Sequence, residues 1–244
     1  MIIFNKERYS RQLPIIGEEG QKRLESARVL IAGVGGLGSI VSIYLAASGI
    51  GKLILVDPDI IKLSDLNRQI LYTSKDLGKK KVAVAKERLQ SLNPEVNIDT
   101  LDEHIAEDNA FDLVKSADIV VDCLDNWKTR FILDEAICKS KKILIHGGIE
   151  GLYGQVTDIV PHETLCLRRL ISEPRDKEFV PVLGTTPGII GLIQATETIK
   201  LLAGIGRPLI NKMLVYDGYI TEFNIIELKP TQENLYFCWG ECHE

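Results

Sequence analysis

The chain has 244 residues, of which 45% are apolar and 26% are charged. This composition is typical of a soluble globular protein, and the length allows one large, well-buried core. The formal net charge of -5 excludes a general attraction to nucleic acid or to an anionic membrane, so an anionic ligand must meet a local cluster of basic residues. We therefore expect neither a nucleic-acid nor a membrane partner.

The N-terminus and the cysteines predict a cytoplasmic protein. The opening segment, MIIFNKERY, is charged within six residues, which argues against a signal peptide, and the chain has no run of about 18 uncharged apolar residues that would cross a bilayer. Five cysteines without regular short spacing indicate reduced thiols, some of them candidate metal ligands, rather than a disulfide framework. Cys123 and Cys138 lie in apolar segments and are expected in the core.

The first part of the chain alternates short apolar runs with stretches of helical period. Strands are predicted at 28–33, 52–57, 96–101, 118–123 and 142–147, and helices at 36–48, 79–92, 108–115 and 127–139. This repetition of strand and helix predicts a mainly parallel sheet covered on both faces.

From about Gly147 the pattern changes. Strands are predicted at 151–160, 212–216 and 220–228, the last two joined by a turn at 217–219, and residues 163–181 are predicted as a long polar loop. A helix follows that loop, with Thr185 or Thr186 as N-cap, Pro187 at its first position and Gly204 past its end. The expected fold class is α/β, a Rossmann-like doubly wound and mainly parallel sheet with an antiparallel C-terminal extension.

A glycine motif at the first strand-to-helix turn predicts a phosphate site. Gly33, Gly35 and Gly38 form G-x-G-x-x-G, where missing side chains let phosphate approach the backbone N–H groups at the positive end of a helix. Asp57 ends the next predicted strand, a position suited to binding a ribose hydroxyl. Together these residues indicate an adenine nucleotide; the alternative is a glycine turn that only packs helix on strand.

The residues around the motif distinguish between nucleotides. Hydride transfer needs a substrate domain with an acid or base, whereas nucleotidyl transfer needs cations that neutralise phosphate charge. Basic residues are plentiful here, in the segments RYSRQ (8–12), LNRQ (66–69) and GKKK (78–81), and Arg130 follows DCLDN (122–126). This pattern favours ATP.

These segments, together with GVGGLGS (33–39), DPD (57–59) and GQVT (154–157), resemble the adenylyltransferases of the MoeB/ThiF/HesA family, which are related to ubiquitin-activating enzymes. The resemblance runs from Arg8 to about Leu228 in the expected order. It implies one adenylation domain over 1–244, with a nucleotide-binding half at about 1–147, a carrier-binding sheet extension and crossover loop at about 148–230, and a tail at 231–244. It also implies ATP-dependent adenylation of the C-terminal glycine carboxylate of a small β-grasp, ubiquitin-like sulfur-carrier protein ending in Gly-Gly, with release of pyrophosphate.

The resemblance also assigns roles to single residues. Gly36 corresponds to the glycine whose backbone lies on the nucleotide, and Asp57 to the acid on its ribose. Arg68, beside Asn67, corresponds to a phosphate-binding arginine, and Lys81 to the lysine that reaches the phosphates. Asp125, with Asn126 beside it, corresponds to the acid that positions magnesium. Arg11 corresponds to an arginine that reaches into the partner subunit's site, which implies a homodimer.

Each of these residues also has a plainer interpretation. Arg68 and Lys81 are alternatively solvated surface charges, and Arg11 a member of a surface ion pair. Asp125 is alternatively the cap of the helix that begins at Asn126. His146, at the end of an apolar strand, is expected to be a satisfied core residue rather than a ligand.

The chain departs from the family in its cysteines. Many relatives hold structural zinc with two C-x-x-C pairs, but here the first pair reads Cys166-Leu-Arg-Arg169 and the second, Cys238 to Cys242, is one residue too long. Arginine does not bind zinc. Three thiolates and His243 leave two alternatives open, a Cys₃His zinc site and free thiols.

Two further departures concern the reaction. No cysteine lies between Cys166 and Cys238, so a covalent thioester or persulfide step in that loop is not expected, and the reaction is expected to stop at the adenylate. Asp65 stands where relatives have asparagine. Two rival functions remain, a nicotinamide-dependent oxidoreductase and a binding module that holds ATP or a carrier tail without turnover.

Overall fold

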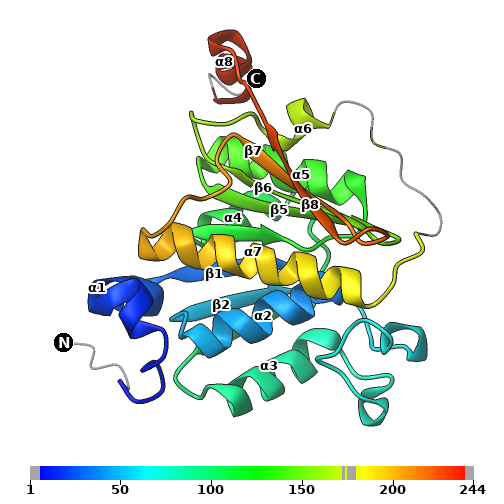
Figure 1. The fold of residues 1–244 in the computed structure, drawn as a ribbon. Helices are drawn as coiled ribbons and strands as arrows, with labels where there is room; N and C mark the ends of the chain where they lie inside the picture. The colour runs from blue at the N-terminus through cyan, green and yellow to red at the C-terminus, as the bar shows by residue number, and fades with distance from the viewer. Residues whose placement is uncertain (1–5, 172–173, 175–179, 240–244) are drawn as a thin grey trace.

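A computed structural model describes residues 6–171, 174 and 180–239 of the chain (Figure 1). Within them, one sheet has the strand order β3-β2-β1-β4-β5-β6-β7-β8. Its strands are β1 (Arg28–Ala32), β2 (Lys52–Val56), β3 (Asn97–Leu101), β4 (Ile119–Asp122), β5 (Ile143–Glu150), β6 (Tyr153–Ile159), β7 (Lys212–Asp217) and β8 (Glu222–Glu227). The first five strands are parallel, and β6, β7 and β8 each pair antiparallel with their predecessor.

Helices cover both faces of this sheet (Figure 1). They are α1 (Leu13–Ser26), α2 (Gly36–Ser48), α3 (Lys81–Leu92), α4 (Ala110–Lys115), α5 (Trp127–Ser140), α6 (Leu167–Leu170), α7 (Thr185–Ala203) and α8 (Gln232–Trp239), with short 3₁₀ turns at Leu63–Asp65 and Ser74–Asp76. Helices α1, α2, α3 and α7 bury one apolar cluster against the sheet, and α4, α5, α6 and α8 bury a second.

Strand β1 shows why both faces are apolar. Val29 and Ile31 belong to the first cluster and Leu30 to the second, because successive side chains of a strand point to opposite faces. A strand buried on both sides reads as a continuous apolar run, and this is the pattern of RVLIA. No described helix is long and apolar enough to span a membrane.

Helix α7 differs from its predicted start. It begins at Thr185 after Gly184 as N-cap, so neither threonine caps it and Pro187 is not its first residue. The Oγ1 of Thr186 instead donates to the carbonyl oxygen of Gly151, at 2.9 Å. The hydroxyl predicted to cap the helix therefore ties its first turn to the β5–β6 connection.

Three helices have no counterpart in the sequence prediction. The period of α1 is broken by Gly17, which has a positive φ of 71° inside the helix. Helix α6 is one turn long and lies within the segment predicted as a loop, of which residues 172–173 and 175–179 lie outside the described residues. Helix α8 forms in the tail and packs Cys238 and Trp239 into the second cluster.

Candidate active site

A cleft of about 1220 Å³ opens at the carboxyl ends of β1, β2 and β4. The strand order reverses between β1 and β4, and this is where ligands bind in open α/β sheets. The cleft exceeds the roughly 300–1,000 Å³ of most small-molecule sites. It continues along β6 and β7, where Tyr153, Gln155 and Val215 line it.

The glycine motif forms the turn between β1 and α2 at the edge of the cleft. Gly33 has a φ of 90°, and a Cβ there would lie 2.8 Å from the carbonyl oxygen of Cys123. Gly38 lies one turn into α2, and a Cβ there would lie 2.0 Å from the carbonyl oxygen of Gly33. Gly33, Gly35 and Gly36 line the cleft, whereas Gly38 is not among the lining residues. The third glycine of the motif therefore serves close packing of the turn, and its predicted role in cofactor binding stays a prediction.

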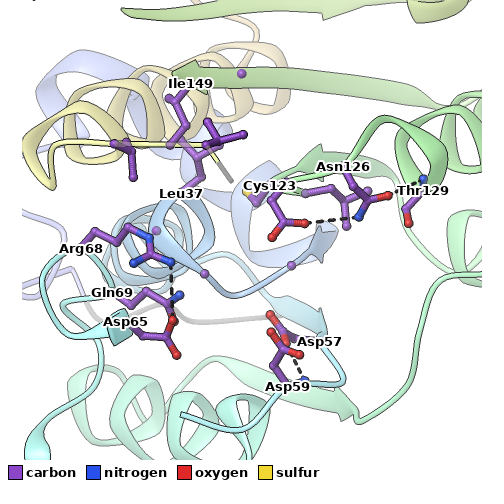
Figure 2. Close-up of a pocket in the computed structure, with 18 of the residues that line it drawn as sticks. Leu37, Asp57, Asp59, Asp65, Arg68, Gln69, Cys123, Asn126, Thr129 and Ile149 are labelled. Atoms are coloured by element: carbon purple, nitrogen blue, oxygen red, sulfur yellow. Dashed lines mark hydrogen bonds and ion pairs between the residues drawn. The ribbon is translucent and has the colours of Figure 1, made fainter. Parts of the chain in front are cut away.

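Asp57 follows β2 and is 6% exposed. Its Oδ2 accepts a hydrogen bond from the backbone N–H of Val34 at 2.7 Å. Its Oδ1 accepts one from the backbone N–H of Asp59 at 2.9 Å (Figure 2). Burial raises the pKa of Asp57 above its usual range, although the charge of Lys81 and these two hydrogen bonds oppose the shift. The carboxylate thus holds the glycine turn while it lines the cleft.

Lys81 opens α3 and reaches the cleft from the side of β2. Its side chain is 6% exposed and its Nζ lies 2.8 Å from Oδ2 of Asp59. Burial alone would raise the pKa of Asp59, but the hydrogen bond and charge of Lys81 outweigh it, and the pKa is lowered. Lys81 is therefore no solvated surface lysine; it is a buried cation paired with one partly exposed carboxylate.

Arg68 lies on another side of the cleft, next to the start of α7 (Figure 2). Its Nη1 donates to the carbonyl oxygen of Ser64 at 2.8 Å and to Oδ1 of Asn67 at 3.1 Å. Its Nη2 lies 3.5 Å from Oδ1 of the buried Asp65, whose Oδ2 accepts from the backbone N–H of Lys62. Asp65 therefore closes its own 3₁₀ turn and partners the arginine.

Asp125 and Asn126 follow β4 and line the cleft, and Figure 2 shows Asn126 on the side opposite Arg68. Asn126 caps α5: its Oδ1 accepts from the backbone N–H of Thr129 at 2.9 Å. Its Nδ2 donates to Oδ1 of Asp125 at 3.3 Å. The alternative of Asp125 as the helix cap is wrong, because its neighbour fills that role and leaves Asp125 exposed at the cleft.

A network of polar side chains is centred on Asp122, the last residue of β4. Asp122 is fully buried and receives Nε of Arg130 at 3.1 Å and Nδ1 of His146 at 2.7 Å. Burial would raise the pKa of Asp122, but Arg130 and His146 lower it. Burial lowers the pKa of His146 and keeps the imidazole neutral. Gln155 is the last member of this network, and its Nε2 lies 3.2 Å from Nε2 of His146.

A model of the ThiF family matches residues 9–240. The chain belongs to the ThiF family. It is 41% identical over 221 residues to Protein HesA, heterocyst, of Trichormus variabilis, a match that covers 89% of this chain and 83% of that protein. It is 38% identical over 237 residues to the sulfur carrier protein adenylyltransferase of Thermus thermophilus, covering 91% and 87%.

Solved structures agree with the family match. The crystal structure of E. coli MccB with ATP has a TM-score of 0.79 and 25% identity to this chain, over 93% of this chain and 73% of that one. The expected family and the expected fold class are thereby confirmed.

Most of the site residues that the ThiF resemblance implies meet in the cleft. Asp57, Asn67, Arg68, Lys81, Asp125 and Asn126 all line it, together with Gly33, Gly35 and Gly36. Arg11 does not: it lies exposed in the turns that precede α1. Its role in a partner's site stays a prediction.

The zinc ligands considered for this ThiF-family chain are only partly described. Cys166 and Cys238 come together, with their sulfur atoms 2.8 Å apart, whereas Cys242 and His243 lie outside the described residues. Cys138 was expected to be a core residue and is buried, and its thiol also contacts that of Cys166.

Sequence reasoning missed Asp59 as the partner of Lys81. It also missed the polar network that links Asp122 through His146 to Gln155. Asp59 and Gln155 each belong to a segment that carries the family resemblance, DPD and GQVT, but nothing in either segment names its partner. The expectation that His146 is a satisfied core residue agrees with its full burial and its two contacts.

Proposed function

We propose that the protein uses ATP to adenylate the C-terminal glycine carboxylate of a small ubiquitin-like sulfur-carrier protein. One observation carries the proposal: a buried lysine, an arginine and an exposed acid line one cleft around the glycine turn between β1 and α2. Membership of the ThiF family, and relatives that match over most of both chains, support an adenylyltransferase.

The chemistry follows from charge. A carboxylate oxygen of the carrier attacks the α-phosphorus, a C–O–P bond forms, the bond to the β-phosphate breaks, and pyrophosphate leaves with the electron pair. Two like unit charges about 4 Å apart repel by roughly 4 kcal/mol at an effective dielectric constant of 20. Lys81 and Arg68 offset this repulsion as positive charges fixed before the reaction begins.

Lys81 lines the cleft and lies near two carboxylates. Its Nζ is 2.8 Å from Oδ2 of Asp59, and the charge of Lys81 also opposes the rise that burial causes in the pKa of Asp57. Nucleotide phosphates carry more charge than Asp59 and make charge-assisted hydrogen bonds with ammonium groups. Lys81 is thus oriented by Asp59 and exchanges this partner for phosphate when ATP binds.

Magnesium is implied by the resemblance, and the residues present fit it. Asp125 offers a carboxylate at the cleft, of which one oxygen accepts a hydrogen bond from Asn126, and carboxylate oxygen is a preferred magnesium ligand. Bound there with the phosphates, the ion would neutralise the developing charge. The chain's own contribution is to hold Asp125 beside the capped start of α5.

The carrier's place is proposed from the continuation of the cleft over β6 and β7. Gly154, Gln155 and Val215 line this part, beyond the glycine turn and Asp57. Apolar side chains are exposed on β8 and on the turn before it, namely Tyr219, Ile220, Phe223, Ile225 and Ile226. We assign residues 1–147 to the nucleotide and 148–230 to the carrier, so that the extended tail runs along β6 toward Asp125.

Pyrophosphate exchange tests this function. The purified protein is incubated with ATP, magnesium, labelled pyrophosphate and, in turn, each Gly-Gly-ending β-grasp protein encoded in the same genome. Label is expected in ATP only with the correct carrier, because adenylation is reversible. Exchange without a carrier, or hydride transfer to NAD, contradicts the proposal.

A further inference from the structure

Three thiols and one carboxylate meet outside the cleft, between α5, α6 and α8. Asp134 and Cys138 lie on α5, Cys166 is the N-cap of α6, and Cys238 lies on α8. A carboxylate oxygen of Asp134 and the sulfurs of Cys138 and Cys166 all lie within 4.8 Å of one another. The sulfur of Cys238 lies 2.8 Å from that of Cys166.

The backbone is organised around these groups. Asp134 and Cys138 are four residues apart on α5 and therefore share one face of the helix. The two oxygens of Asp134 accept the backbone N–H groups of Leu167 at 2.8 Å and Arg168 at 3.0 Å. The backbone N–H of Cys166 donates to the sulfur of Cys238 at 3.0 Å. Hydrogen bonds of this kind orient carboxylate and thiolate ligands around a metal.

The separations suit one tetrahedral ion. A Zn–S bond of about 2.3 Å puts two sulfurs of a tetrahedral site roughly 3.8 Å apart. The spacing of 2.8 Å between the sulfurs of Cys166 and Cys238 and the limit of 4.8 Å between the donor atoms of Asp134, Cys138 and Cys166 lie on either side of that value. Small side-chain shifts are therefore enough to bring the four donors around one ion.

We propose that Asp134, Cys138, Cys166 and Cys238 bind one zinc ion. Helix α5 thereby supplies two ligands in place of the cysteines that the two C-x-x-C pairs of relatives provide. Arg169 stands at one of those positions, and Cys242 follows Cys238 by one residue more than in a C-x-x-C pair. The ion fastens α8 to α5 and α6, where Trp239 already donates from Nε1 to the carbonyl oxygen of Thr164.

Zinc content and X-ray absorption of the unmodified protein test the site without any variant. After purification from zinc-supplemented medium without chelators, one zinc per chain is expected, with a shell of three sulfurs and one oxygen. Absence of zinc overturns the proposal. A shell of four sulfurs, or one with the scattering pattern of imidazole, also overturns it, because those shells need a ligand outside the four proposed residues.

Cobalt substitution identifies the ligands. Tetrahedral cobalt bound by thiolates has visible bands and a sulfur-to-metal charge-transfer band that grows with each thiolate. Cys138→Ser should lose roughly a third of that band, since two of three thiolates remain. Asp134→Asn should shift the visible bands. The rival pair, Cys242→Ser with His243→Ala, and the matched cysteine control, Cys123→Ser, should leave the spectrum unchanged.

Loss of the charge-transfer band in Cys242→Ser with His243→Ala, and no loss in Cys138→Ser, would overturn the assignment of the two α5 residues as ligands.

Hydrogen exchange gives a readout in the unmodified chain. Removing the ion with a chelator should abolish the protection of amides in α8, while those of β1 stay protected. None of these measurements depends on turnover in the cleft, so their failure is distinct from failure of the proposed adenylation.

Discussion

The amide of Gln155 is fixed by His146, with the two Nε2 atoms 3.2 Å apart. Asp122 is ionised and only accepts, so Nδ1 of His146, at 2.7 Å from it, carries the ring proton. Nε2 of the neutral ring then accepts a hydrogen from the Gln155 amide. The carbonyl oxygen of Gln155 consequently faces away from the histidine, on a residue that lines the cleft.

We expect Gln155 to accept a hydrogen bond from a peptide N–H of the carrier's tail. Gln155→Leu should therefore raise the carrier concentration needed for half-maximal pyrophosphate exchange about fivefold, the equivalent of about 1 kcal/mol for one hydrogen bond. ATP affinity, measured by calorimetry, should stay unchanged. An equal loss of ATP affinity would mean that the residue supports the nucleotide side of the cleft instead.

Asp59 should compete with the phosphates of ATP for the ammonium group of Lys81, and calorimetry measures this competition as a change in ATP affinity. Asp59→Asn removes the carboxylate that holds the ammonium group, so ATP should bind roughly 1.4- to fivefold more tightly at low salt, in line with about 0.2–1 kcal/mol for a partly exposed ion pair. Lys81→Ala should abolish pyrophosphate exchange. A large loss of ATP affinity in Asp59→Asn would show that Asp59 positions the lysine more than it competes with phosphate.

Asp125 and Asn126 are neighbours with separable roles. Asp125→Ala should abolish pyrophosphate exchange and leave the unfolding free energy within about 0.5 kcal/mol, because the acid is exposed and caps nothing. Asn126→Ala should instead lower the free energy of unfolding by about 1 kcal/mol through loss of the cap on α5. Chemical denaturation and exchange assays on both variants check this, and full activity in Asp125→Ala would remove its proposed metal role.

Asp158 and Glu197 predict a pH-dependent stability away from the cleft. Both are buried, and both accept the backbone N–H of Leu209, at 2.8 and 3.0 Å. Burial, and next the charge of Glu197, raise the pKa of Asp158 to about 8. Because the folded state holds this proton more tightly than the unfolded state, the stabilisation is complete below the unfolded value of about 4 and is lost as the pH rises through 8.

Asp158→Asn removes the ionisation and keeps an oxygen for Leu209. Denaturation should show a gain in unfolding free energy over the parent protein that is at least about 1 kcal/mol larger at about pH 9 than at about pH 4. Lys200, which lies 2.6 Å from Glu197, stays in place as the charge partner. A gain that does not change with pH would show that Asp158 does not hold the proton.

Arg11 predicts a shared site in a homodimer. Arg11→Ala and Lys81→Ala proteins should each be inactive, because every site lacks either the borrowed arginine or its own lysine. After subunit exchange about half the dimers are mixed, each with one complete site, so roughly a quarter of wild-type sites should return. Absence of recovery after exchange is verified by native mass spectrometry would contradict a contribution from the partner.

Much of the sheet and the glycine turn could be predicted because their signals are local. Strand β1 is a continuous apolar run buried on both faces, and its alternate residues enter the two clusters. Gly33 and Gly38 clash with backbone atoms if a Cβ is added, so the residue type alone reveals the tight turn. Asp57 follows the next strand and lines the cleft, and its contact with a ribose stays a prediction.

The partners of these residues were decided only by the tertiary structure. Asp59 and Lys81 are 22 residues apart, and Cys166 and Cys238 are 72 apart, so their contacts depend on strand register and helix packing rather than on spacing. The sequence could not decide whether Asp125 or Asn126 caps α5, because either side chain can cap a helix and only the backbone geometry selects Asn126. The sequence by itself determines the residue types and their periodicity. The contacts between charged side chains depend on how the sheet brings distant segments together.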